Sequence, residues 1–227
     1  MYRIPRIDCN VACPASLEEA FARTVRETVA CNNWPADFPY APQVGFRIFH
    51  TGADLLLRFD VAERCTAART LDDNGPVWTD SCAEFFFRPE GSDSYYNFEC
   101  NCIGTLLVGH RRDRTQAEHA PAEVLRTVRR RATYPHAPLP ETEGDNRWTL
   151  TLAIPAAALF RDRLARWDGV RGAMNLYKCG DDLSCPHYLS WRPVGTPAPD
   201  FHRPEFFEPV FFDMGTVPSF FTTCLLR

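Results

Sequence analysis

Short stretches that alternate apolar and polar residues dominate the chain after residue 40. Val44–Thr51 and Leu55–Val61 alternate in this way, and a turn-forming segment, Thr51–Asp54, separates them. A period of two places apolar side chains on one face of a strand, so these segments predict a β-hairpin. Further strand-like segments follow at Cys82–Arg88, Tyr95–Asn101, Thr105–His110, Arg147–Ile154, Gly172–Cys179, Tyr188–Trp191 and Pro209–Asp213.

Near the N-terminus the apolar positions recur with helical spacing instead. Ser16–Ala30 is predicted to form a helix that Ser16 caps, with two glutamates in the first turn, where the helix dipole favours acidic side chains. Asn32–Pro35 then interrupts the pattern. Pro155–Phe160 predicts a second, short helix, because proline is well tolerated in a first helical turn.

Many short strands separated by turn residues, without strand–helix alternation, predict a mainly β fold. We expect an antiparallel β-sandwich, of jelly-roll or immunoglobulin-like type, with a short N-terminal helix. Residues 1–31 are predicted to form an N-terminal helical extension, and residues 32–227 the sandwich domain. Residues 111–146 are rich in Arg, Pro and acidic residues. This segment is either a long excursion or contains an edge strand.

Composition and charge narrow the class of partner. The 227 residues include 25 basic and 29 acidic side chains, a formal charge of −4, and 45% of them are hydrophobic. Such mild acidity gives no reason to expect nucleic acid, and we interpret Arg129–Arg131 as a solvated face. No apolar stretch approaches the ~20 residues that a membrane-spanning helix needs, so no membrane partner is expected.

The ten cysteines allow two interpretations. An even number permits a disulfide framework in a secreted protein. Residues 1–8, however, lack the apolar core of a signal peptide, and several cysteines lie in strand-like apolar segments, where free thiols act as small hydrophobes. The chain is also long enough to fold without crosslinks. We therefore favour reduced thiols and a cytoplasmic location, with secretion as the alternative if a leader peptide had been removed.

Metal and lysine content add two observations. No Cys-x-x-Cys pair is present, and Cys179, Cys185 and His187 make a poor zinc motif. Lys178 is the single lysine among 25 basic residues. Codon bias toward arginine explains most of the excess of arginine over lysine. The one lysine could have been retained by chance and not for a function. A compact ammonium suits different ligands from a planar guanidinium, so Lys178 is a candidate binding residue.

The motifs of common catalytic sites are missing. The sequence contains no Gly-x-Ser-x-Gly, P-loop, His-Glu-x-x-His or Gly-x-Gly-x-x-Gly motif. Asp80 and Glu84 could be a glycosidase carboxylate pair, but on one strand they would lie about 13 Å apart, beyond the separations used by such enzymes. We predict that the protein is not an enzyme, although the sequence does not exclude a catalytic pair formed by other carboxylates.

Two segments carry the side chains that sugar binding requires. A flat aromatic ring stacks on the apolar face of a sugar, and carboxylate, amide and cationic groups bind its hydroxyls. Trp78 follows a Gly-Pro turn and precedes Glu84, whereas Trp191 ends a strand before a Pro- and Gly-rich loop. For either tryptophan taken alone, core packing is the simpler explanation.

Five motifs occur in order along the chain. They are Val77-Trp78-x-Asp80-Ser81-Cys82-x-Glu84-Phe85-Phe86, Tyr95-Tyr96-Asn97-Phe98-Glu99-x-Asn101-x-Ile103-Gly104-Thr105, Trp148-x5-Ile154-Pro155, Asn175-x2-Lys178-Cys179-Gly180, and Leu189-Ser190-Trp191 with Pro199-Asp200-Phe201-His202-Arg203-Pro204-Glu205-Phe206-Phe207. Each motif alone is unspecific. In combination, from about Asn33 to Phe212, the sequence resembles the family 9-like carbohydrate-binding modules, which belong to the wider group of DOMON-type β-sandwiches.

This resemblance implies a non-catalytic site in which two tryptophans clamp a terminal sugar of a mono- or oligosaccharide. Trp78 and Trp191 would form the clamp, and Glu84 would accept a hydrogen bond from a hydroxyl. Asn97, Glu99 and Asn101 alternate onto one face of their strand, where they either contact the sugar or form a solvated outer face. Asn175 and Lys178 have opposite parity on their strand, so only one of them is expected to face the site.

The family also includes modules with structural calcium, which the oxygen-rich loops Asp72–Asn74 and Asp181–Asp182 would suit. No other cofactor is expected. Such modules usually accompany a secreted glycoside hydrolase, and no hydrolase domain is recognised here. Alternatives are a sandwich that has lost sugar binding, a structural or protein-interaction domain, and a glycoside hydrolase. A haem- or redox-binding DOMON-type domain would use Met174, Met214 or the scattered histidines as ligands.

Overall fold

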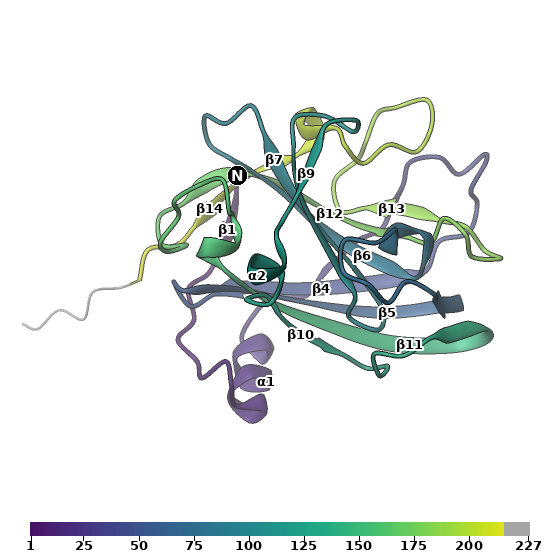
Figure 1. The fold of residues 1–227 in the computed structure, drawn as a ribbon, viewed down its shortest axis with the longest axis horizontal. Coiled ribbons are helices and arrows are strands. Elements are labelled where there is room, and N and C mark those ends of the chain that lie inside the picture. Colours follow the sequence, from purple (N-terminus) through teal and green to yellow (C-terminus); the bar gives the residue numbers. More distant parts are fainter. Residues whose placement is uncertain (216–227) are drawn as a thin grey trace, which may run out of the picture.

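The alternating segments form two facing β-sheets in the computed structural model, which describes residues 1–215 (Figure 1). Sheet 1 contains β1 (Tyr2–Ile4), β3 (Cys31–Asn32), β6 (Cys82–Pro89), β7 (Tyr95–Asn101), β8 (Leu106–Arg111), β9 (Ala117–His119), β12 (Arg171–Cys179), β13 (Tyr188–Ser190) and β14 (Glu208–Phe212). Sheet 2 contains β2 (Glu27–Thr28), β4 (Gln43–His50), β5 (Asp54–Ala68), β10 (Arg129–Ala132) and β11 (Leu139–Pro155). The predicted mainly β sandwich is confirmed.

The strand order places three strands at the centre of sheet 1. The order is β1-β14-β12-β6-β7-β8-β9. Along the edge of β12 that faces away from β6, β14 pairs with the first half of the strand and β13 with the second half. β13 also pairs with β3. Sheet 2 has the order β10-β11-β5-β4-β2. All pairs of strands are antiparallel except β1 with β14. Strands β6, β7 and β12 therefore present a continuous surface on each face of sheet 1.

Strand periodicity decides which side chains fill the space between the sheets. On β6, Phe85 and Phe87 point inward and belong to the main core, whereas Phe86 points outward and packs in a second apolar cluster. On β5, Leu55 and Leu57 join the main core, and the intervening Leu56 contacts a helix on the outer face of sheet 2. Apolar burial on both faces anchors these central strands.

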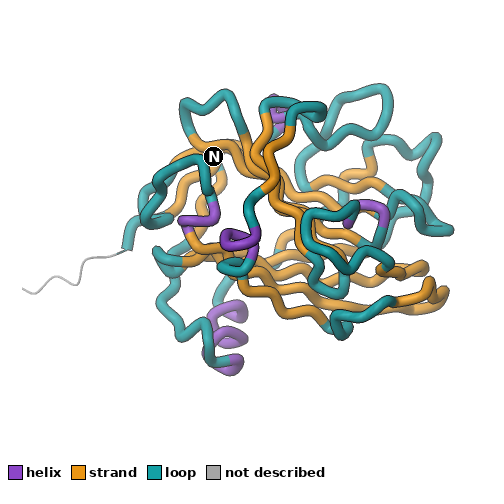
Figure 2. Tube along the Cα trace, in the orientation of Figure 1, coloured by secondary structure: helices purple, strands orange, loops and turns teal. Residues whose placement is uncertain are grey.

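The helices are short and peripheral (Figure 2). The helical elements are α1 (Pro14–Ala22), α2 (Ala122–Leu125) and the 3₁₀ turns η1 (Val77–Thr79), η2 (Ala156–Ala158) and η3 (Pro204–Phe206). The predicted N-terminal helix ends earlier than expected, at Ala22 rather than Ala30. The Thr24 hydroxyl there donates to the Phe21 carbonyl, and Glu27–Thr28 pairs with β4 instead of continuing the helix. Strand pairing thus overrides a weak helical pattern.

Two further segments can be compared with expectation. The segment 111–146 contains β10, the edge strand of sheet 2, so the edge-strand alternative is confirmed. Residues 1–31 supply β1 and β2 as well as α1, and the boundary after residue 31 stays a prediction. Within residues 1–215, no helix has the length and apolar character needed to cross a membrane.

Candidate functional site

Polar side chains form a row across the outer face of sheet 1. Because Phe85 and Phe87 point into the core, Glu84 points to the opposite face. In register, Glu84 pairs with Glu99 on β7 and with Tyr177 on β12. Residues far apart in the sequence are therefore neighbours here, because antiparallel pairing places their Cβ atoms within about 5 Å.

A pocket of about 240 Å³ lies at this row. Its strand-borne lining consists of Glu84, Glu99 and Cys179. The other lining side chains come from η1, strand ends and loops: Trp78, Arg111, Arg114, Asp181, Tyr188, Pro199, Asp200, Phe201 and His202. A rigid sheet thus supplies the buried acidic groups, and the surrounding segments supply aromatic and charged walls.

Trp78 gives the pocket an accessible aromatic surface. Its side chain is 38% exposed, which is unusual among the large apolar side chains of residues 1–215. The backbone around it is fixed, because the Trp78 carbonyl accepts a hydrogen bond from the Asp181 N–H at 3.2 Å, and the Cys179 Sγ lies 3.5 Å from the same oxygen. A fixed backbone with an open indole face suits stacking on a flat apolar ligand surface.

The two central glutamates are protonated more readily than free carboxyl groups. Burial, followed by the charge of Glu99, raises the pKa of Glu84 well above its usual range. Burial likewise raises the pKa of Glu99 to about 7. The Glu84 Oε1 atom accepts a hydrogen bond from the Cys179 thiol at 3.1 Å. At neutral pH the pair therefore offers both a carboxylic O–H donor and carboxylate acceptors.

Asn97 links Glu99 to a positive charge at the pocket wall. The Arg111 Nε donates to the Asn97 Oδ1 at 2.9 Å, and the Asn97 Nδ2 donates to the Glu99 Oε1 at 2.7 Å. Asn97 is fully buried and lies behind the lining, so it orients Glu99 instead of forming part of the wall. The burial of Asn97 and Glu99 excludes the solvated-face alternative for these two residues.

Burial also shifts the pKa values of Asp181 and His202 in the wall. Burial and then the charge of Asp182 raise the pKa of Asp181 to about 6. Burial and then the charge of Arg111 lower the pKa of His202 to about 3, so its ring is neutral. His202 Nδ1 lies 3.0 Å from the Tyr95 hydroxyl. The neutral ring of His202 therefore adds a hydrogen-bonding group to a wall that also carries charged side chains.

The structure does not bring the two tryptophans of the expected clamp together. Trp191 is only 4% exposed and belongs to the main core, not to the pocket lining. Tyr2 and Phe46 contact its ring edge-on, with centroid distances of 5.0 and 5.6 Å. Its position after a strand end, beside a Pro- and Gly-rich loop, suggested exposure, but packing of β1 and β4 covers it.

Lys178 also faces the interior. It is fully buried, and its Nζ lies 2.8 Å from the Glu63 Oε2 and 2.7 Å from the His187 Nε2. The opposite parity of Asn175 and Lys178 is confirmed, with Asn175 on the outer face beside the row. The Asn175 side chain, however, binds the backbone N–H and carbonyl of Arg192, at 3.0 and 3.1 Å, and does not line the pocket.

The carboxylates of Asp80 and Asp73 bind neighbouring loop segments and do not face the pocket. The Asp80 carboxylate accepts from the Arg69 and Thr70 N–H groups and from the Asn101 side chain. It is buried and away from the pocket lining, so it is not a partner for Glu84 in catalysis. In the loop 72–74, the Asp73 carboxylate pairs with Arg130. Calcium binding at the acidic loops stays a prediction.

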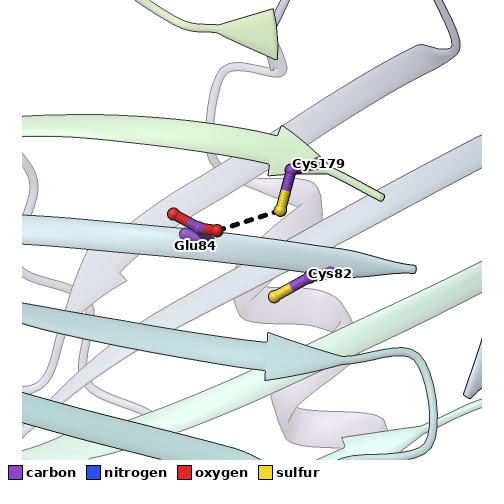
Figure 3. A group of neighbouring side chains, drawn as sticks. All are labelled: Cys82, Glu84 and Cys179. Atoms are coloured by element: carbon purple, nitrogen blue, oxygen red, sulfur yellow. Dashed lines mark hydrogen bonds between the residues drawn. The ribbon is translucent and has the colours of Figure 1, made fainter. Parts of the chain in front are cut away.

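One group of side chains has the composition of a metal site (Figure 3). The ligand atoms of Cys82, Glu84 and Cys179 all lie within 4.8 Å of one another, and all three residues are buried. Two thiols and a carboxylate are zinc ligand types. Burial, however, raises the pKa of Cys82 to about 12 and that of Cys179 in the same direction, which disfavours the thiolates that a metal needs.

Trp78, Glu84 and Glu99 are thus the predicted residues that meet in the pocket. The sequence gives no functional signal for Arg111 or Arg114, which lie at the start of the Arg- and Pro-rich segment 111–146. The segment Asp200–His202 belongs to the fifth motif, which was the available signal for it, whereas Tyr188 was recognised only as the first residue of a predicted strand.

Comparison with known proteins adds independent information. The sequence profile of carbohydrate-binding family 9 matches residues 13–212. A proposed carbohydrate-binding protein from Bacteroides uniformis is 39% identical, with a TM-score of 0.87, and the alignment covers 93% of this chain and 98% of that one. No curated protein gives a match.

Two structures of a family 9 module from Caldicellulosiruptor kristjanssonii share the fold at much lower identity. One, in complex with glucose, is 8% identical with a TM-score of 0.56, and the alignment covers 95% of this chain and 96% of that one. The other, in complex with cellotriose, is 7% identical with a TM-score of 0.57, at 100% and 97% coverage.

Proposed function

Because the chain belongs to carbohydrate-binding family 9, we propose that its pocket on the outer face of sheet 1 binds one sugar unit of a mono- or oligosaccharide without catalysis. The observation that carries this proposal is the exposed indole of Trp78 beside a buried pair of glutamates. An indole accommodates the apolar face of a pyranose, and the polar groups accommodate its hydroxyls. The glucose and cellotriose held by the Caldicellulosiruptor module support this ligand class.

The hydrogen-bonding capacity of the pocket fits hydroxyl groups. Each sugar hydroxyl both donates and accepts, so it needs partners of both kinds. A protonated Glu84 donates, Glu99 held by Asn97 accepts, and Arg111 adds charged N–H donors. Groups buried beforehand lose little further solvation when a ligand covers them, which favours binding.

A single indole, not a clamp between Trp78 and Trp191, is the stacking surface in this proposal. Trp191 is enclosed in the core, and exposing it would require β1 and β4 to move away from its ring. Further aromatic surface in the pocket comes from Tyr188 and from Phe201, whose ring stacks on Tyr177 at a centroid distance of 4.2 Å.

The positions of Glu84 and Glu99 do not suit cleavage of a glycosidic bond. Glu84 and Glu99 are adjacent on one floor, at the spacing of cross-strand neighbours. A glycosidase instead needs its two carboxyl groups to flank the bond that is cleaved, on different sides of the sugar. Absence of turnover of chromogenic glycosides is expected, and measurable hydrolysis that Glu84→Gln abolishes would contradict a purely binding role.

The proposal is tested by calorimetric titration of the full chain with a panel of soluble mono- and oligosaccharides that includes glucose and cellotriose. At least one sugar is expected to bind. Trp78→Ala is expected to weaken its binding by tenfold or more, because stacking of a flat ligand surface on an aromatic ring contributes roughly 1–3 kcal/mol. Val25→Ala, a change at another exposed apolar side chain, is the control and should leave affinity unchanged. Equal affinity of the wild type and Trp78→Ala would refute this site.

A further inference from the structure

Two cysteines, one on a strand of sheet 2 and one on a loop between strands of sheet 1, are in contact outside the pocket. Cys65 lies near the end of β5 in sheet 2, and Cys185 lies in the loop that joins β12 to β13 of sheet 1. Their Sγ atoms are 2.9 Å apart although the residues are 120 positions apart in sequence. Among residues 1–215 both are present as free thiols. The fold has therefore placed two thiols at a reacting distance without a covalent bond between them.

The surroundings of this pair differ from those of the other buried cysteines. Ala67, Leu183 and Tyr40 pack around it as a small apolar cluster. The Arg64 Nε lies 3.0 Å from the Cys185 Sγ, and its guanidinium also stacks over Tyr40. The Arg64 side chain is about half-exposed, so an accessible positive group covers the sulfur. Positive charge beside a sulfur is the setting in which cysteines react as thiolates.

We propose that Cys65 and Cys185 form a site of reversible thiol–disulfide exchange that takes a small-molecule disulfide, such as glutathione disulfide, as its oxidant. The Cys185 thiolate attacks one sulfur of that disulfide, which forms a mixed disulfide and releases one glutathione thiolate. Cys65 then attacks the Cys185 sulfur, which releases the second glutathione. The protein loses two electrons and two protons, and glutathione disulfide gains them as two thiols.

The order of the two steps follows from burial. Cys65 is 1% exposed and Cys185 is 5% exposed, and burial raises the pKa of Cys65 to about 11. Cys65 is therefore the poorer first nucleophile and acts as the resolving thiol. Its reaction is intramolecular, with the Cys185 sulfur already in contact, so proximity offsets its low thiolate fraction.

A disulfide here would tie sheet 2 to a loop that supports the pocket. The Asp181 and Asp182 N–H groups of this loop donate to the Trp78 and Thr79 carbonyls, at 3.2 and 3.1 Å. At its other end, the His187 Nδ1 lies 2.9 Å from the Cys185 carbonyl. Because the crosslink closes a long stretch of chain, it restricts the unfolded state strongly. Oxidation is therefore expected to raise stability and to slow opening of residues 180–187.

The test incubates the reduced full chain with glutathione disulfide and then maps its peptides without reduction. We expect a peptide that joins Cys65 to Cys185, an intact mass lower by two hydrogens, and a melting temperature higher by roughly 5–15 °C. Amide hydrogen exchange of residues 180–187 should slow in the oxidised form. Cys65→Ser and Cys185→Ser should each abolish the crosslink and the rise in melting temperature.

Cys9→Ser is the matched control, because Cys9 packs beside α1 on the other face of sheet 2 and should not change the response. The wild-type peptide map decides the matter even where a serine variant folds poorly. The proposal is overturned if Cys65 and Cys185 both stay open to alkylation after oxidation. It is equally overturned if the oxidised protein carries a crosslink between Cys82 and Cys179 instead.

Discussion

At the scale of single residues, the charged side chains Glu84 and Lys178 lie on opposite faces of sheet 1, one at the pocket and the other in the interior. Glu84 was chosen for its type and its distance from Trp78, and strand parity placed it on the pocket face. Lys178 is a candidate by sequence because it is the only lysine. In the structure its side chain forms a buried ion pair with Glu63 instead of a ligand contact. Whether a side chain faces inward depends on which strands cover it, and local sequence does not contain that information.

The protonation state of Glu84 can be tested by two substitutions. Burial and the neighbouring Glu99 raise its pKa, which favours the neutral carboxyl group. Glu84→Gln keeps a neutral donor and acceptor and should retain sugar affinity within about threefold. Glu84→Ala removes the hydrogen bonds and should weaken binding roughly five- to tenfold. Calorimetric titration checks both, and a loss for Gln as large as that for Ala would contradict a neutral Glu84.

Glu99 gives a prediction for the dependence of stability on pH. Its pKa is raised from 4.5 to about 7, so the folded state binds this proton more tightly than the unfolded state does. The associated stability is present below pH 4.5 and is lost as pH rises through about 7, an effect of roughly 3 kcal/mol. Urea unfolding at pH 4 and pH 8 should show that Glu99→Gln loses less stability over this interval than the wild type. Identical losses would contradict the assignment.

At the scale of elements, periodicity predicted the strands but not their neighbours. The period of two in Tyr95–Asn101 correctly grouped Asn97 with Glu99 on one face of the strand. That β12 lies beside β6 is a long-range pairing, which no local pattern specifies. The N-terminal helix was predicted too long, because the segment after Ala22 is rich in β-branched residues and its residues Glu27–Thr28 pair with β4 as β2.

The first strand provides an element-scale prediction. β1 pairs in parallel with β14, and Ile4 is fully buried in the main core. Ile4→Ala should lower the free energy of unfolding by about 2–5 kcal/mol, because it leaves a cavity between the sheets. Arg3→Ala on the same strand removes a surface ion pair with Asp213 and a cation–π contact with Phe211, and it should cost about 1 kcal/mol or less. Chemical denaturation measures both, and equal effects would mean that β1 does not contribute to the core.

At the scale of the whole molecule, the main core and the pocket lie on opposite faces of sheet 1. The space between the two sheets holds Trp191, Lys178 and most of the apolar side chains, and the outer face of sheet 1 holds the pocket. The sandwich could be predicted from its many short strands. The pocket could be predicted only in part, because Tyr188, Arg111 and His202 reach it from loops and strand ends whose positions depend on the complete fold.

The central claim is that sugar binds against Trp78 and not between Trp78 and Trp191. The most direct measurement follows the five tryptophan indole N–H resonances during titration with glucose or cellotriose, with each resonance assigned by a Trp→Phe variant. The resonance of Trp78 should shift in a saturable manner. Those of Trp34, Trp148, Trp167 and Trp191, whose side chains are buried, should stay in place. A saturable shift at Trp191 with none at Trp78 would contradict this account.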